Sequence, residues 1–448
     1  MQAPVSTTST PTPRPAMALN PFQQLMYDWG RLKAYNAGQM MTLAGIPDLN
    51  RWNLAANRVL QAIGIGRPSF SGDAVSFEPA EVSLQSACTD FVTLATTQLA
   101  LPFSADQIPI RFFLLPDAPD RYSLLTIYDH WLADSYSIRN IMCLLRQAYG
   151  QPDAALQNVP SMTACDHRHY FGRRLAPAIA LRDWLFSARD YWRHRSAYRM
   201  GISDPTDFTC GFDFHRLPAG LISALRHTAK RQSATVHDLF LASLAVAMGE
   251  FTAPHRAKPR SRRLHPPRRA IALGTIVDIR NQAHPSLDNI FGMYLSCYAT
   301  VLQAPEACNA QHLVQQIARR SRKVKQSAEA VRAFDSFAVA QFWWRRYRQA
   351  RHHADFFAKN LPTVAGISNV NLTGTWCNPP VPDAAGLPAV LDYVRISPTG
   401  PLSPLVLTLT TIGSELTLAT TWRTMAINRQ QASQIIERFK SVLVEFAS

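Results

Sequence analysis

The stretch 128-YDHWLADSYS-137 joins an apolar run to a helical pattern, and the interpretation of the whole chain starts from it. Before it, "RYSLLTIY" (121–128) predicts a strand. After it, residues 138–149 place apolar side chains on one helical face, and Ser135 or Ser137 can cap the helix start. The histidine and the aspartate four positions later therefore occupy a strand-to-helix junction, where polar side chains are held in place yet accessible.

Length and composition indicate a globular protein with more than one core. The chain has 448 residues, of which 47% are hydrophobic and 17% are charged. This composition is typical of folded domains, and the length is sufficient for two sizeable cores. Residues 1–20 are rich in Ser, Thr and Pro and have no apolar core typical of a signal peptide, so we expect a disordered tail.

Several function classes are disfavoured by what the sequence lacks. The longest apolar run, "LFLASLAVAM" (239–248), is shorter than the roughly 18 residues of a membrane span and predicts a buried helix. The seven cysteines form no CxxC pair and no metal-ligand spacing, and there is no Gly-rich phosphate loop. We therefore expect no metal and no bound cofactor, and a cytoplasmic location.

The charge balance is strongly basic, with 46 Lys and Arg against 31 Asp and Glu. Basic residues gather at 255–269, 319–325 and 343–353. They can be solvated loops and helix faces, or they can attract an acidic protein, an anionic cofactor or an anionic membrane surface. Nucleic acid is an unlikely partner, because no helix-turn-helix, zinc-finger or RNA-binding signature accompanies them.

Helical and strand patterns are mixed in both halves of the chain. We expect helices over 22–36, 49–63, 178–199 and 310–332, two helices within 216–251, a C-terminal helix from Asn428, and strands over 40–46, 121–128, 270–280, 405–412 and 415–422. Gly413-Ser414 joins the last two strands as a turn of the type with glycine first. Two α/β layers packed side by side are therefore predicted.

The heptapeptide Asp129-His130-Trp131-Leu132-Ala133-Asp134-Ser135 resembles the HHxxxDG motif of the chloramphenicol acetyltransferase-like superfamily. That superfamily includes condensation domains of peptide synthetases, wax ester synthases and plant acyltransferases of the BAHD type. Four other segments resemble its landmarks in the right order: "PFQQLMYDW" (21–29), "ATVHDLFLASLAVAM" (234–248), "VDIRNQAHPSLDNIFGMYLS" (277–296) and "GISNVNLTG" (366–374). The order of these segments makes the resemblance more specific than the short motif alone.

The resemblance implies a fold and a domain division. We expect an α/β fold of two chloramphenicol acetyltransferase-like halves that form a V-shaped pseudo-dimer with a central tunnel. Residues 21–175 would form the N-terminal half and residues 216–448 the C-terminal half, with residues 176–215 as the crossover between them.

The resemblance also assigns roles to residues. His130 occupies the place of the catalytic histidine. Asp134 and Arg280 match an aspartate and an arginine that pair across the two halves and support the site. Asp129 and Ser135 depart from the family motif, which has His and Gly there, and we expect both near the tunnel.

Two further residues, Ser368 and Asn369, belong to the last of the four landmark segments. They can line the tunnel, although a turn at a strand end explains them equally well.

The implied chemistry is acyl transfer from a thioester to a hydroxyl or amine. A neutral imidazole with a pKa of about 6.5 suits removal of the acceptor's proton. The donor would be acyl-CoA or an acyl group on the phosphopantetheine arm of a carrier protein. We expect the reaction to belong to secondary-metabolite or lipid biosynthesis. Two alternatives stay open: a wax ester synthase-like enzyme that uses long-chain acyl-CoA at a membrane surface, and a degenerate, non-catalytic domain that recruits a partner.

Overall fold

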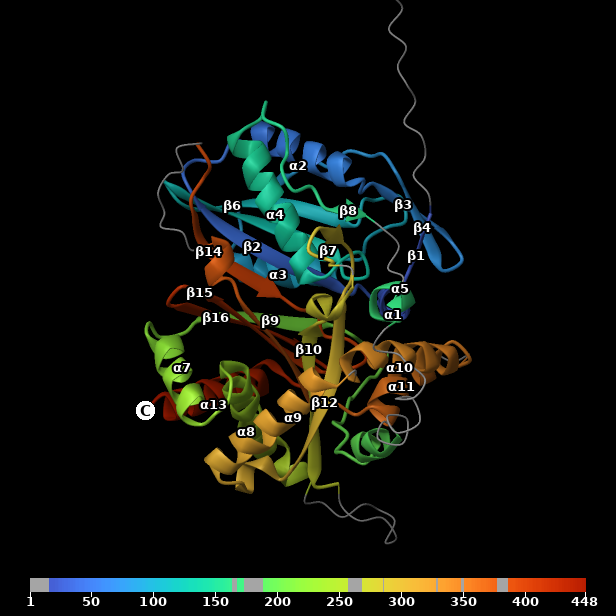
Figure 1. Cartoon of the computed structure of the whole chain (residues 1–448), viewed down its shortest axis with the longest axis vertical. Helices are drawn as coiled ribbons and strands as arrows, with labels where there is room; N and C mark the ends of the chain where they lie inside the picture. The colour runs from blue at the N-terminus through green and yellow to red at the C-terminus, as the bar shows by residue number, and fades with distance from the viewer. Residues whose placement is uncertain are drawn as a thin grey trace, which may run out of the picture.

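Two β-sheets divide the chain into two lobes in the computed structural model (Figure 1). The structure describes residues 16–162, 167–172, 188–256, 268–284, 286–327, 329–347, 350–376 and 386–448. The α/β fold class predicted from the sequence is confirmed.

The N-terminal lobe is built on a five-stranded sheet in the order β14-β2-β7-β6-β5. The strands are β2 (Asn36–Ala44), β5 (Gln85–Ser86), β6 (Ile110–Ala118), β7 (Arg121–Asp129) and β14 (Val390–Ile396). Helices α2 (Leu49–Ile63) and α4 (Ser135–Gly150) pack together over one face, and α3 (Phe91–Ala100) covers the other. The alternating strand pattern places Leu124 in the core under α2 and α4, and its neighbour Leu125 in the core beside α3.

The C-terminal lobe is built on a six-stranded sheet in the order β12-β10-β13-β15-β16-β9. The strands are β9 (Cys210–Arg216), β10 (Ala270–Asp278), β12 (Leu295–Gln303), β13 (Ala365–Asn371), β15 (Leu405–Ile412) and β16 (Glu415–Arg423). Helices α7 (Leu221–Arg231), α8 (Val236–Arg256), α9 (Ala310–Gln326) and α13 (Arg429–Ala447) pack on it and form a second core.

Smaller elements complete the two lobes. They are the sheet of β1 (Met17–Ala18), β3 (Arg67–Ser71) and β4 (Ala74–Glu78), the pair β8 (Ser161–Met162) and β11 (Ile290–Phe291), and the helices α1 (Pro21–Gly30), α5 (His167–Phe171), α10 (Glu329–Trp344), α11 (Ala350–Asn360) and α12 (Thr373–Trp376). Helix α1 packs against α10, where the Phe22 and Phe337 rings stack with centroids 4.4 Å apart. This contact ties the start of the chain to the C-terminal lobe.

Strand exchange joins the lobes. Strand β14 comes from the C-terminal part of the chain but pairs antiparallel with β2 in the N-terminal sheet. Strand β9, which lies in the segment expected as a crossover, pairs with β16 at the edge of the C-terminal sheet. A third core, which includes residues of β2, β7, β9, β14 and α3, lies between the sheets. The boundaries expected from the sequence therefore differ from the physical lobes.

Several expected helices and strands have the predicted bounds. Helix α2 spans Leu49–Ile63, and α13 begins after the cap residue Asn428. Gly413 has a positive φ of 57° in the turn between β15 and β16, as the predicted turn requires. Thr235 accepts a hydrogen bond from the amide of Asp238 and begins α8 as expected. Local patterns thus decided these elements.

Other expectations were wrong. Helix α1 ends at Gly30 and not at 36, because Asn36 already pairs with Asp129 in the sheet. The helix expected at 310–332 is two helices, α9 and α10. Part of the expected tail is ordered, since Met17–Ala18 form β1; residues 1–15 lie outside the described residues. Of the helix expected at 178–199, residues 188–195 are helical, and residues 178–187 lie outside the described residues.

Helix α8 is the one helix in the described part of the chain that is long and apolar enough to cross a membrane. However, 67% of its apolar window is buried inside the protein. Its residues Leu241 and Leu244, for example, are fully buried in the C-terminal core. We therefore interpret α8 as a core helix, as the sequence predicted.

Candidate active site

His130 is held at the junction between β7 and α4 by two backbone contacts. Its amide donates to the carbonyl oxygen of Tyr35 at 3.1 Å. Its ring Nδ1 lies 3.3 Å from the carbonyl oxygen of Ala133. Because a carbonyl oxygen can only accept, Nδ1 must carry the proton in the neutral ring. The lone pair then resides on Nε2, which forms no hydrogen bond with any described residue.

Aromatic rings surround the imidazole. The Tyr35 ring stacks on it with centroids 5.8 Å apart, and the Tyr128 ring meets it edge-on at 5.9 Å. Burial lowers the pKa of His130 to about 4, since the charged ring would lose its hydration. The imidazole is therefore neutral at physiological pH and has one nitrogen able to accept a proton.

A cavity of about 1410 Å³ runs between the lobes and reaches His130. Ser135, Ser368 and Asn369, which the sequence predicted as lining residues, also line it. Its apolar wall is formed by side chains of α1, α10 and α11: Phe22, Leu25, Met26, Trp29, Phe337, Ala340, Phe356 and Phe357. An apolar chain thus has room beside the histidine.

Asp134 and Arg280 form the ion pair that the resemblance implied, and the pair is deeply buried. Arg280 Nη1 donates to Asp134 Oδ2 at 2.6 Å, and Nη2 donates to Oδ1 at 3.0 Å. Asp134 has no exposed surface and Arg280 only 6%. The amide of Tyr294 also donates to Oδ2 at 2.8 Å. These contacts occupy both oxygens of the Asp134 carboxylate, which is not among the groups that line the cavity.

The same aspartate begins α4. Its Oδ1 accepts from the amide of Ser137 at 2.9 Å, which makes Asp134 the N-cap residue. The sequence predicted Ser135 or Ser137 as the cap, which was wrong. Asp134 is the N-cap residue because its carboxylate lies between the helix N-terminus and an arginine and can neutralise both positive groups at once.

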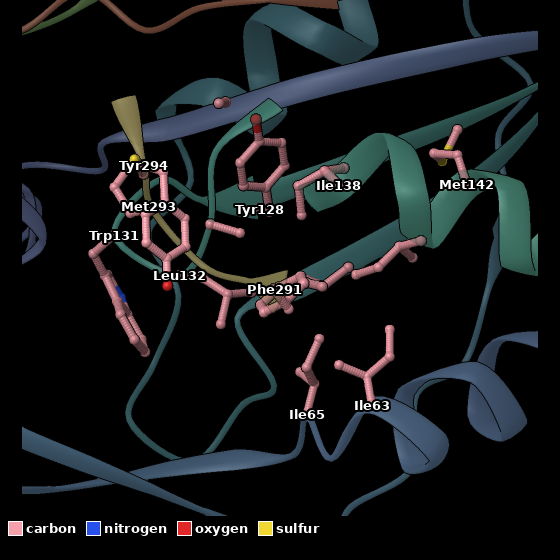
Figure 2. Close-up of a cluster of buried hydrophobic side chains, with 14 of the residues drawn as sticks. Ile63, Ile65, Tyr128, Trp131, Leu132, Ile138, Met142, Phe291, Met293 and Tyr294 are labelled. Atoms are coloured by element: carbon pink, nitrogen blue, oxygen red, sulfur yellow. The ribbon is translucent and has the colours of Figure 1, made fainter. Parts of the chain in front are cut away.

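Core packing anchors the loop that carries the histidine. Figure 2 shows Trp131 and Leu132 beside Phe291, Met293 and Tyr294, which come from the C-terminal lobe. Trp131 is 3% exposed and its ring contacts Phe70 with centroids 5.1 Å apart. The two residues after His130 therefore hold the loop by burial, while His130 itself faces the cavity.

Asp129 does not line the cavity, contrary to our expectation. Its neighbours Tyr128 and His130 do line it, and the strand alternation turns Asp129 to the opposite side. There its Oδ1 is buried without a hydrogen-bond partner, and burial raises the pKa of Asp129 to about 7. Asp129, the first position at which the chain departs from the HHxxxDG motif, thus lies outside the cavity.

Sequence reasoning missed many cavity residues. Those with titratable side chains include Arg139, His194, Asp278 and Arg395. A charged residue among apolar neighbours in "LDYVRI" was a usable signal for Arg395, since an arginine on a buried strand is rare. For the others no local pattern existed, because the fold alone brings them to the cavity.

Metal ligands do not gather at the site. The described residues contain no cluster of three or more His, Cys, Asp or Glu side chains with metal-binding geometry. The described side chains of the cavity include the imidazoles of His130 and His194, the carboxyl group of Asp278, several hydroxyls and buried arginines.

The fold matches that of known acyltransferases over nearly the whole chain. The trichothecene 15-O-acetyltransferase TRI3 from Fusarium sporotrichioides is 11% identical, with a TM-score of 0.73 over 96% of this chain and 94% of that chain. The condensation domain of the monacolin K polyketide synthase MokA is 14% identical, with a TM-score of 0.66 over 97% and 98%. The chain has the condensation-domain fold.

A third similar structure was solved to explain condensation domain-mediated chain release from the enacyloxin polyketide synthase. It is 15% identical, with a TM-score of 0.57 over 100% of this chain and 84% of that chain. No family model and no curated protein sequence matches this chain. The two-lobed fold predicted from the resemblance is thus confirmed by structure.

Proposed function

We propose that the protein transfers an acyl group from a thioester to a hydroxyl or amine acceptor, with His130 as the general base. The observation that carries the proposal is the distance of 3.3 Å between His130 Nδ1 and the Ala133 carbonyl oxygen. Because that oxygen can only accept, we assign the proton to Nδ1, which leaves the Nε2 lone pair for the acceptor's proton. The condensation-domain fold of the chain supports it, since the similar structures include an O-acetyltransferase.

In the proposed reaction, Nε2 of His130 takes the acceptor's proton while the acceptor's oxygen or nitrogen attacks the thioester carbonyl. The carbon–sulfur bond then breaks, and the imidazolium returns the proton to the thiolate. Such proton transfer contributes about 10²–10⁴ in rate, and alignment of the reactants in the cavity adds to it. The low pKa of His130 favours rapid return of the proton to the leaving group.

The cavity rim suggests how the donor arrives. Exposed apolar side chains of Trp192, Val339, Trp343 and Tyr347 line the opening. Beside them, α9 carries exposed basic side chains, among them Arg319, Arg322 and Lys325. A rim of this kind fits an acidic carrier protein or the phosphates of coenzyme A. The chain-release structure favours a carrier-bound donor.

The rim also favours a second candidate, a wax ester synthase-like enzyme at a membrane surface. Exposed Phe342 and Trp343 near the end of α10, with Arg346 over the Phe342 ring, are the residue types that insert at an anionic lipid interface. In that case long-chain acyl-CoA would be the donor.

The decisive experiment offers three donors to the protein with a panel of alcohols and amines. The donors are acetyl-CoA, acyl groups on carrier proteins, and palmitoyl-CoA with anionic vesicles, and products are read by mass spectrometry. We expect His130→Ala to lower kcat by about 10²–10⁴. A matched control is His194→Ala, because His194 lines the same cavity and its pKa is also lowered to about 4 by burial, but its Nε2 contacts Thr363 Oγ1 at 3.2 Å.

The control should keep most of the activity. Equal losses in the two variants would contradict the role of His130. Absence of product with every donor would favour a non-catalytic, partner-recruiting domain.

A further inference from the structure

Arg395 is a buried arginine in the wall of the cavity. It lies on β14 opposite Gln39 of β2, and it is 4% exposed. Its Nη1 donates to Ser135 Oγ at 3.2 Å and its Nη2 to Ser368 Oγ at 3.0 Å. Its buried Nε has no acceptor. A guanidinium has five N–H donors, so most of its capacity is unused.

The charge of Arg395 has no carboxylate counterion among the described residues. Two other buried arginines are paired, Arg280 with Asp134 and Arg256 with Glu306, whereas buried Arg139 and Arg423 form no ion pair among the described residues. Arg395 forms no ion pair with a carboxylate anywhere in the described part of the chain. Burial and the nearby charge of Arg139 lower its pKa to about 10, so it is still protonated at neutral pH. A buried charge without a counterion is costly, and a bound anion would remove that cost.

The neighbours of Arg395 are also suited to an anion. The hydroxyls of Ser135 and Ser368 accept from the guanidinium, so the hydrogen of each is available to a ligand oxygen. Ser135 is the first residue of α4, where the helix dipole is positive. Arg139, which is 8% exposed, adds a second positive charge to the same cavity. The carboxylate of Asp278 also lines the cavity, but it lies 3.6 Å from Arg280 Nη1 and so faces a different arginine.

We propose that Arg395, Ser135 and Ser368 bind a carboxylate group of the substrate. A carboxylate matches the single positive charge and can accept from Nε and from both hydroxyls. The substrate of the His130 cavity would then be a carboxylic acid, either as acceptor or as acyl group. The statement that the carboxylate belongs to the substrate rests on the proposed function, whereas the statement that these three residues bind a carboxylate does not.

The test measures binding by calorimetry in the His130→Ala variant, where turnover is expected to be slow, and each probe is added without a second substrate. One pair of probes tests the acceptor: 3-hydroxybenzoate and its neutral analogue 3-hydroxybenzamide. The other tests the acyl group: succinyl-CoA and butyryl-CoA. We expect the acid of at least one pair to bind about 10–100-fold more tightly than its neutral partner. The pair that shows the preference identifies the source of the carboxylate.

Adding Arg395→Gln should abolish the preference and leave the neutral probe unchanged. Arg193→Gln is the control, since Arg193 lines the cavity, is exposed and donates to the Val301 carbonyl. This control should keep the preference. If Arg395→Gln does not fold, Ser135→Ala with Ser368→Ala removes the hydroxyl donors and should weaken acid binding.

The proposal is overturned if neither acid is preferred, or if the preference survives Arg395→Gln. A preference for the acid without acyl transfer by the parent protein would instead reject only the proposed function.

Discussion

Asp129 shows how one residue can depart from a motif without entering the site. It follows the strand alternation of β7, so its carboxyl turns away from the cavity that Tyr128 and His130 face. Its Oδ1 is buried without a partner, and burial raises the pKa of Asp129 to about 7. A carboxyl of this kind strains the fold when it is ionised.

We expect Asp129→Asn to stabilise the protein at alkaline pH. The pKa of Asp129 is higher in the folded than in the unfolded state, so the protein is stabilised below the unfolded pKa and loses this stability as pH rises through about 7. The variant should gain about 3 kcal/mol over the parent between pH 5 and pH 9. Urea unfolding of both proteins at the two pH values measures it, and an equal difference at both would contradict the raised pKa.

Helix α4 depends on one aspartate for both its start and its link to the other lobe. Asp134 caps the helix through Ser137 and neutralises Arg280. The site loop ends at this residue, so the position of His130 depends on the same carboxylate. Structure and site are coupled in this element.

Asp134→Ala should therefore destabilise the protein far more than the loss of a cap. It removes the carboxylate that both terminal nitrogens of Arg280 contact and leaves only Asp278, 3.6 Å from Nη1, as a counterion. Breaking such a buried pair costs about 3–5 kcal/mol, in addition to about 1 kcal/mol for the cap. Asp48→Ala is the matched control, because exposed Asp48 caps α2 through the amide of Arg51. The free energy of unfolding in urea measures both. Similar losses in the two variants would show that the pair with Arg280 contributes little.

The two lobes are held together by a strand that one lobe contributes to the sheet of the other. Strand β14 completes the N-terminal sheet, and a shared core fills the space between the sheets. The cavity lies between the same lobes, so His130 from one lobe and Ser368 from the other meet only when both are folded. We expect the two lobes to unfold as one cooperative unit.

Phe439→Ala tests this cooperativity. Phe439 is fully buried on α13 in the C-terminal core, and its truncation should cost about 3–5 kcal/mol. Hydrogen exchange should then show equal loss of protection in β15 of the C-terminal lobe and in β7 of the N-terminal lobe. Loss confined to β15 would mean that the lobes unfold independently.

The sequence by itself predicted several of the local elements, the fold and the position of His130 beside the pair of Asp134 and Arg280. Apolar periodicity located α2 and α13, because a helix face is decided within one segment. The motif resemblance located His130 and its supporting pair Asp134 and Arg280. It succeeded because residues fixed in order along the chain carry that information.

Tertiary structure alone decided the remaining features. The early end of α1, the exchange of β14 and the cavity position of Arg395 all follow from pairing between distant strands. A local pattern cannot show which strands pair, because strand pairing depends on residues hundreds of positions apart. The sequence thus located His130, the base that we propose, and only the fold placed a buried positive charge in the wall of the same cavity.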